Sequence, residues 1–189
     1  MPETDLVTRC KQGDRTAFDE LVNQYKNQVV NIAYGMMSDR EDALDAAQEV
    51  FVRVYRSIGS FKENSSLSTW IYRITANVCN DILRKRQRAG NIISIDSQND
   101  DDERGFEIQD VSAAPEELAE KNERIRIVRQ YISELSEEYR EVIVYCDIEG
   151  MSYDEIAEIL DCPQGTVKSR LNRARNALRK KLLEYRELF

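Results

Sequence analysis

Basic side chains with no acid among them fill the stretch between Pro163 and Leu183. They are Lys168, Arg170, Arg173, Arg175, Arg179, Lys180 and Lys181. Arginine and lysine bind phosphates, and arginine can also donate two hydrogen bonds to the edge of guanine. Apolar residues at three- and four-residue spacing, from Val167 to Leu178, give the same stretch a buried side. A basic helix face is often merely exposed to water. The basic pattern therefore indicates a function only together with the neighbouring elements that position it.

A second, shorter helix precedes the basic one, and the junction between them is tight. Ser152 and Glu155 form the S-x-x-E pattern that caps a helix start. Pro163 ends that helix and suits the first turn of the next. Asp161 occupies the turn position where glycine is common, and aspartate tolerates that geometry. The two helices are typical of a helix-turn-helix, which places its second helix in the DNA major groove.

The composition argues against catalysis. The 189 residues include no histidine, which removes the usual general base and the commonest zinc ligand. We expect no catalytic residues, no metal, no cofactor and no small-molecule substrate. The four cysteines form no C-x-x-C pair and are interpreted as buried, reduced thiols. Because neither a signal peptide nor a membrane span is recognisable, we expect a cytoplasmic protein.

Charge is segregated along the chain. The net charge is −8, which looks unfavourable for a protein that binds nucleic acid. Residues 91–115 hold seven acids against one arginine, a net charge of −6 that leaves only −2 for the remainder. This segment has no helical period, so we interpret it as a flexible acidic linker. The basic regions therefore lie outside it, on both sides.

The remainder of the sequence predicts helices throughout. Apolar stripes with a helical period run through 18–36, 47–58 and 67–82 and are separated by turn residues at 13–14, 38–39 and 59–60. After the linker, stripes over 125–135 and 139–146 precede the helix-turn-helix. We predict an all-α fold with two helical domains, 1–90 and 116–189, joined by the flexible acidic linker at 91–115.

Four motifs in order resemble a known family. They are ALDAAQEVF at 43–51, FKENSSLSTWIYRITAN at 61–77, LSEEYREV at 135–142, and the helix-turn-helix with GTVKSRL at 165–171. Together they resemble the extracytoplasmic-function sigma factors, the minimal two-domain type of the sigma-70 family. The resemblance covers nearly the whole chain. It implies promoter recognition and strand opening together with bacterial RNA polymerase.

The resemblance assigns the second helix of the first domain to the polymerase. The residues that match the region gripping the coiled coil of the β′ subunit are Asp45, Gln48, Glu49, Phe51 and Val52. Four of them share one face at helical spacing, with Phe51 beside them. Relatives often carry glutamate at the position of Leu44, so one polar contact is weakened here. The other implied partners are the β flap, promoter DNA and an anti-sigma factor.

The resemblance assigns the loop at 61–66 and the helix after it to the minus-ten element. Hydroxyl and amide groups of the loop can bind an unstacked base, and the helix can follow the displaced strand. The implied residues are Phe61, Asn64, Ser65, Ser66, Asn77, Asn80, Arg84, Lys85, Arg86 and Arg88. The resemblance assigns Thr166, Lys168, Ser169, Arg170 and Arg173 to the minus-thirty-five element.

Two other functions fit parts of the sequence. A stand-alone DNA-binding regulator would use only the helix-turn-helix. Its first half would be expected to hold a ligand pocket, a receiver or a dimer seam. An enzyme acting on nucleic acid would need a histidine or a metal-binding carboxylate cluster. The polar loop and the Asn/Arg helix of the first half favour the sigma factor.

Overall fold

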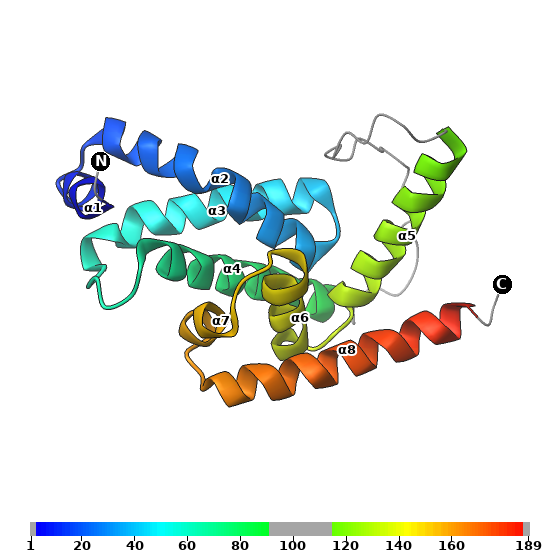
Figure 1. Cartoon of the computed structure of the whole chain (residues 1–189). Coiled ribbons are helices and arrows are strands. Elements are labelled where there is room, and N and C mark those ends of the chain that lie inside the picture. Colours follow the sequence, from blue (N-terminus) through cyan, green and yellow to red (C-terminus); the bar gives the residue numbers. More distant parts are fainter. Residues whose placement is uncertain (1–2, 91–114, 187–189) are drawn as a thin grey trace.

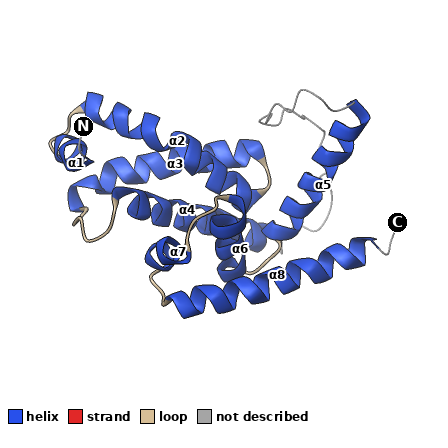
Figure 2. Cartoon of the chain, in the orientation of Figure 1, coloured by secondary structure: helices blue, strands red, loops and turns tan. Residues whose placement is uncertain are grey.

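The computed structural model describes residues 3–90 and 115–186, and all regular elements in these ranges are helical (Figure 1, Figure 2). The predicted all-α class is therefore confirmed. The segment predicted as a linker lies outside the described residues, except for Pro115, which begins a helix. We call residues 3–90 the N-terminal half and residues 115–186 the C-terminal half.

Four helices build the N-terminal half. They are α1 (Glu3–Lys11), α2 (Arg15–Met37), α3 (Arg40–Ser57) and α4 (Leu67–Gly90), with a short 3₁₀ turn at Ile58–Ser60. Asp14 and Asp39 cap α2 and α3 by accepting backbone N–H bonds, and Ser38 closes α2 in the left-handed conformation at φ 64°. These caps lie at the predicted turns. Helix α1 precedes the first stripe that the sequence analysis identified.

The C-terminal half contains the helix-turn-helix at its end. Its helices are α5 (Pro115–Ser133), α6 (Glu137–Ile143), α7 (Tyr153–Leu160) and α8 (Gln164–Arg186). A π-helical turn at Val144–Ile148 follows α6, where the sequence predicts a continuous helix. There the N–H of Glu149 bonds to the carbonyl of Val144, five residues back. The wider turn brings Tyr145 fully inside, where its hydroxyl donates to the Tyr72 carbonyl at 2.9 Å.

The two halves pack directly on each other. Helices α6 and α7 lie between α4 and α8, and α5 contacts α2 (Figure 1). The Ser38 hydroxyl donates to the Arg129 carbonyl at 2.5 Å, and the Arg129 guanidinium lies 4.1 Å from the centre of the Tyr34 ring. One buried apolar cluster includes residues of both halves. The halves are therefore in contact through core side chains, not only through polar surface groups.

Two further features of the sequence analysis can be compared with the structure. The prediction that all four thiols are buried holds for Cys10 and Cys79 and is wrong for Cys146 and Cys162, which are half-exposed. Burial raises the pKa of Cys79 to about 12, so this thiol stays protonated at neutral pH. No helix within the described residues combines the length and the apolar character that crossing a membrane requires.

Candidate nucleic-acid interface

The helix-turn-helix is built by local interactions that the sequence predicts. Ser152 and Glu155 form the reciprocal capping box at the start of α7. Asp161 ends α7 in the left-handed conformation, at φ 49° and ψ 50°. The N–H of Thr166 then bonds to the Pro163 carbonyl at 2.8 Å and opens α8. These contacts set the angle at which α8 leaves the turn.

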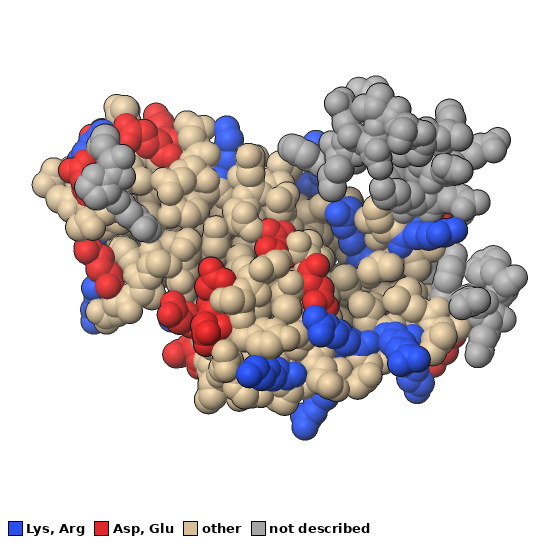
Figure 3. All heavy atoms as spheres, in the orientation of Figure 1, with Lys and Arg blue, Asp and Glu red and all other residues tan. Residues whose placement is uncertain are grey.

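Helix α8 has a buried side and a basic side. Val167, Leu171 and Ala174 are buried against the C-terminal half. Figure 3 shows Lys and Arg side chains along the surface of α8 and acidic side chains on its neighbours. This arrangement fits a helix that packs by one face and meets phosphates with the other.

The residues predicted to meet the minus-thirty-five element differ in availability. Lys168, Ser169 and Arg173 are exposed, and Lys168 lies 5.7 Å from the centre of the Tyr153 ring. Thr166 is half-buried at the start of α8. Arg170 is half-exposed and forms a 3.0 Å ion pair with Glu138 of α6. Arg170 would have to break this pair before it could reach a base.

Arg175 is held by the protein itself. Its guanidinium donates to both carboxylate oxygens of Asp147, at 3.0 and 2.5 Å. The hydrogen bond to Asp147 raises the pKa of Arg175, which therefore keeps its charge. This residue braces α8 against the π-helical turn.

The loop before α4 presents fewer groups than its sequence suggests. Phe61 is only 7% exposed and its ring packs on Trp70, with centroids 5.0 Å apart. Ser66 caps α4 by accepting the N–H of Thr69 at 3.1 Å. Asn64 and Ser66 are exposed, and Ser65 is half-exposed. In this conformation Asn64 and Ser65 are the loop groups best placed for a base, because Phe61 and Ser66 have structural partners.

On α4, two of the predicted strand-binding residues face the C-terminal half. Asn80 is 5% exposed and donates to the Glu141 carboxylate at 2.7 Å. Arg84 forms two hydrogen bonds of 2.6 Å with the Glu137 carboxylate. The hydrogen bond with Arg84 lowers the pKa of Glu137, whereas burial raises the pKa of Glu141. Asn77 remains exposed on the same helix.

The basic run at the end of α4 is mostly open. Lys85 and Arg88 are exposed. Arg86 instead forms two hydrogen bonds with the carboxylate of Asp42 on α3, and this contact raises its pKa. Among the described residues, the run thus offers Lys85 and Arg88 to a phosphate backbone, whereas Arg86 ties α4 to α3.

A separate apolar surface lies on α3. Asp45, Gln48 and Val52, three of the residues predicted to bind the polymerase, are exposed. Phe51 packs on the core, and Glu49 bonds to Arg53 at 2.8 Å. The exposed residues that the sequence analysis undervalued or missed are Leu44, 44% exposed, and Tyr55, 56% exposed. Their spacing from Gln48 and Val52 is helical, so a search for surface apolar residues in register with Gln48 would have found them.

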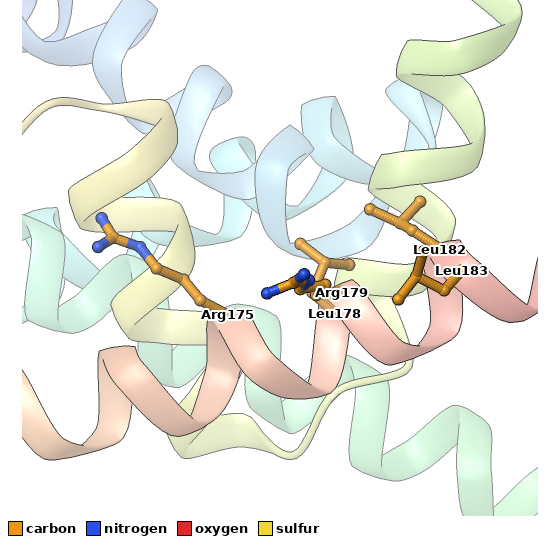
Figure 4. A pocket seen from close by; sticks show the side chains of 5 residues that line it. All are labelled: Arg175, Leu178, Arg179, Leu182 and Leu183. Atoms are coloured by element: carbon orange, nitrogen blue, oxygen red, sulfur yellow. The ribbon is translucent and has the colours of Figure 1, made fainter.

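A shallow hollow also opens beside the C-terminal part of α8. Figure 4 shows its lining along one stretch of the helix: Arg175, Leu178, Arg179, Leu182 and Leu183. Leu183 is 48% exposed, and Ile125 on neighbouring α5 is 38% exposed. An apolar helix or loop could fit here. Within residues 3–90 and 115–186, no cluster of His, Cys, Asp or Glu is suited to hold a metal ion.

Comparison of the sequence with family models gives two matches. Residues 21–89 match the model described as Sigma-70 region 2, and residues 125–178 match Sigma-70, region 4. The ECF RNA polymerase sigma-E factor of Haemophilus influenzae is 40% identical over 180 residues, which cover 94% of this chain and 93% of that protein. The ECF RNA polymerase sigma factor SigW of Bacillus subtilis is 36% identical over 176 residues, 93% of this chain and 94% of its own.

Solved structures share the fold. CnrH in complex with the cytosolic domain of CnrY matches with a TM-score of 0.67 at 24% identity, covering 97% of both chains. The sigma factor RpoE in complex with the anti-sigma factor NepR, from Bartonella quintana, matches with a TM-score of 0.62 at 25% identity. That match covers 87% of this chain and 96% of RpoE.

Proposed function

The chain belongs to the extracytoplasmic-function sigma factors of the sigma-70 family, and we propose that it directs core RNA polymerase to specific promoters and assists strand opening there. One observation supports this proposal independently of family membership. A single chain combines a basic, solvent-facing helix α8 with an Asn/Arg face on α4 in the other half. Duplex recognition and single-strand binding need such different surfaces.

We assign the minus-thirty-five element to α8. Arg173 and Lys168 are exposed beside Ser169, so their donors are available to base edges or phosphates. Thr166 and Arg170 belong to the same proposed set, with Arg170 released from Glu138 on binding. Arg173 is the proposed base reader because arginine binds guanine bidentately.

We assign the minus-ten element to the loop and to α4. Asn64 and Ser65 would take the unstacked base, with Ser66 and Phe61 shaping the loop around it. Asn77, Lys85 and Arg88 would follow the displaced strand. Arg86 would contact the same strand while it remains paired with Asp42. Asn80 and Arg84 belong to this set and are the members that α6 now occupies.

We assign the polymerase contacts to two surfaces. The α3 surface, with Asp45, Gln48 and Val52 at its centre, would bind the β′ coiled coil. Glu49 and Phe51 would support it from its edge. The hollow beside α8 would take the β flap, since an exposed apolar helix side beside cations suits an amphipathic partner. An anti-sigma factor is a further proposed partner, because the solved relative RpoE is bound to one.

The proposed role involves no catalysis by this chain, and its site of action is the cytoplasm, where polymerase and DNA are found. The test is run-off transcription with purified bacterial core polymerase, with and without this protein, on a fragmented genomic template. Discrete transcripts that require the protein are expected. If core polymerase produces the same transcripts alone, the proposed function is wrong.

A further inference from the structure

Helix α1 lies at the same end of the molecule as the loop that joins α3 to α4 (Figure 1). Its inner side belongs to the core, where Leu6, Val7 and Cys10 are buried. The helix also contacts the 3₁₀ turn at Ile58–Ser60, from which the loop leaves. Helix α1 is therefore a fixed part of the N-terminal half, against which the loop can be held.

The C-terminal end of α1 is tied to α2. Gly13 adopts the left-handed conformation at φ 82°, so the chain can turn sharply between the two helices. Arg9 donates through Nε to the Asp14 carboxylate at 2.9 Å and through Nη1 to the Glu20 carboxylate at 3.4 Å. Because Asp14 also caps α2, these bonds connect both helix ends. Lys11 thus extends from a fixed backbone position.

Lys11, the last residue of α1, contacts two residues of the loop. Its Nζ donates to Glu63 Oε1 at 2.7 Å, across 52 positions of the sequence. The same Nζ lies 5.8 Å from the centre of the Phe61 ring, within the range of a cation–π contact. Since Phe61 is itself packed on Trp70, Lys11 links the anchored start of the loop to its middle.

The backbone of Glu63 adopts a conformation that depends on such a contact. Its φ of 56° lies in the left-handed region, which residues other than glycine, asparagine and aspartate rarely occupy. Without a bond that holds it, the chain at Glu63 would favour other conformations. Asn64 and Ser65 follow directly in the sequence, so their positions depend on the backbone of Glu63.

The contact also neutralises a carboxylate beside the proposed base site. The Glu63 side chain is 45% exposed and lies one residue before Asn64. An unpaired carboxylate at this place would repel the phosphates of a DNA strand. Paired with Lys11, Glu63 can hold the loop without this repulsion.

We propose that Lys11 is a positioning residue for base capture: by holding Glu63 it keeps Asn64 and Ser65 in the conformation that binds the unstacked minus-ten base. This inference rests on the proposed minus-ten role of the loop. A preformed loop binds more tightly because less conformational entropy is lost on binding. Lys11 should therefore affect capture of the base and leave recognition by α8 unchanged.

The first test measures how much the captured base contributes to affinity. The probe is a fluorescent fork-junction fragment of a promoter identified by run-off transcription, bound by the protein together with core polymerase. Abasic sites placed one at a time along the single-stranded minus-ten segment locate the captured base, whose loss should weaken binding by about fivefold or more. The readout is the ratio of the affinities for the intact and the abasic probe, because long-range charge effects act on both.

Replacement of Lys11 should lower this affinity ratio. For Lys11→Met we expect a ratio about threefold below that of the parent, since a partly exposed ion pair is weak. Lys26→Met is the matched control. It removes the same charge from a lysine that bonds to Asn23 within α2, so it should keep the parent ratio.

Two further variants distinguish positioning from direct contact with DNA. Lys11→Arg retains a cation for Glu63 and should keep the parent ratio. Lys11→Glu combined with Glu63→Lys exchanges the two charges, preserves the ion pair and leaves the net charge unchanged. This exchanged variant should recover most of the parent ratio. A lysine that bound DNA itself could not be replaced by glutamate, so failure of the exchange would contradict positioning through Glu63.

The second test requires neither DNA nor polymerase. Nitrogen-15 relaxation of the free protein reports the order of the backbone amides at residues 63–65. The parent should have order parameters near about 0.85, and Lys11→Met should lower them towards about 0.6. Ser66 should stay ordered, because it caps α4. Circular dichroism verifies that each variant is folded.

Two results would overturn the inference. One is an unchanged affinity ratio in Lys11→Met, and the other is a loop that is already disordered in the parent or equally ordered in Lys11→Met. Run-off transcription by the parent separates this failure from that of the proposed function. Promoter-dependent transcripts together with an unchanged ratio would retain the sigma role and remove positioning by Lys11. A parent that yields no such transcripts would remove the proposed function, and the positioning role with it.

Discussion

Helices α4 and α8 both carry residues predicted to bind DNA, but carboxylates of the protein itself occupy more of these residues on α4 than on α8. On α8, Lys168, Ser169 and Arg173 are exposed. On α4, Asn80 is buried and Arg84 is paired with Glu137. The difference comes from the neighbours, since α6 directs two carboxylates at α4 and a single one, Glu138, at α8. A residue that is predicted to contact DNA can thus be held by a partner within the protein.

Replacement of Arg140 should have the largest effect on the free energy of unfolding, because Arg140 anchors α6, the helix whose carboxylates contact α4. Its Nη2 donates to the carbonyls of Ser133 at 3.0 Å and Leu135 at 2.7 Å. Arg140→Ala should destabilise the protein by about 3 kcal/mol or more, since it removes buried charge-assisted bonds. Urea unfolding measures this. Arg84→Ala is the exposed control and should stay near the parent, and a small change for Arg140→Ala would contradict the anchoring role.

The pH dependence of closure should be the next largest effect. Burial raises the pKa of Glu149 from 4.5 to about 7. A closed state, in which the two halves pack together as in this structure, therefore binds the Glu149 proton more tightly than an open state, in which the halves are apart. The closed state is therefore favoured at low pH and weakens as the pH rises from about 4.5 to about 7. Glu137 has the opposite effect at lower pH. The hydrogen bond with Arg84 lowers its pKa, so protonation of Glu137 weakens the contact between the halves.

Fluorescence energy transfer between labels attached at exposed Asn27 on α2 and exposed Asn172 on α8, measured from pH 5 to 8, tests this sign. The parent should lose transfer as pH rises. Glu149→Gln should remain closed and respond less, because its amide stays neutral and can still contact Gln28. Tyr72 and Tyr145 also lie in this region, but burial raises the pKa of both above their ordinary value of 10. A parent that closes more tightly at pH 8 would contradict the argument.

Arg173→Ala should sharpen the comparison at α8. A lost base contact costs about 1–3 kcal/mol, so transcription should fall about tenfold or more at promoters with an intact minus-thirty-five element. Arg170→Ala should cost less, because this residue must first leave Glu138. Run-off assays on intact and scrambled elements separate the two. Equal losses on both templates would argue against base reading by Arg173.

The loop before α4 provides the smallest expected effect, on stability. Ser66→Ala should destabilise the protein by about 1 kcal/mol, because it removes the cap of α4. Joint replacement of Asn64 and Ser65 by alanine should leave stability unchanged but impair strand opening. Thermal unfolding and permanganate reactivity of promoter thymines measure the two effects. Normal opening by the double variant would remove these residues from base capture.

Local interactions explain what could be predicted from the sequence. The all-α class, the capping box at Ser152 and Glu155, and the turn at Asp161 depend on residues within a few positions of one another. Helical periodicity likewise identified α2, α3 and α4. Charge patterning found the basic side of α8. Such signals are contained in a short window, so they survive without knowledge of the tertiary structure.

Long-range packing decided the rest. Asn80 meets Glu141 across 61 positions, and Arg73 caps α7 from 85 and 86 positions away. No local pattern predicts that Phe61 is buried on Trp70. By itself the sequence led, through its family resemblance, to a prediction of which side chains bind DNA and polymerase. The tertiary structure decided which of them are free, because availability depends on the carboxylates and carbonyls that packing brings to each helix.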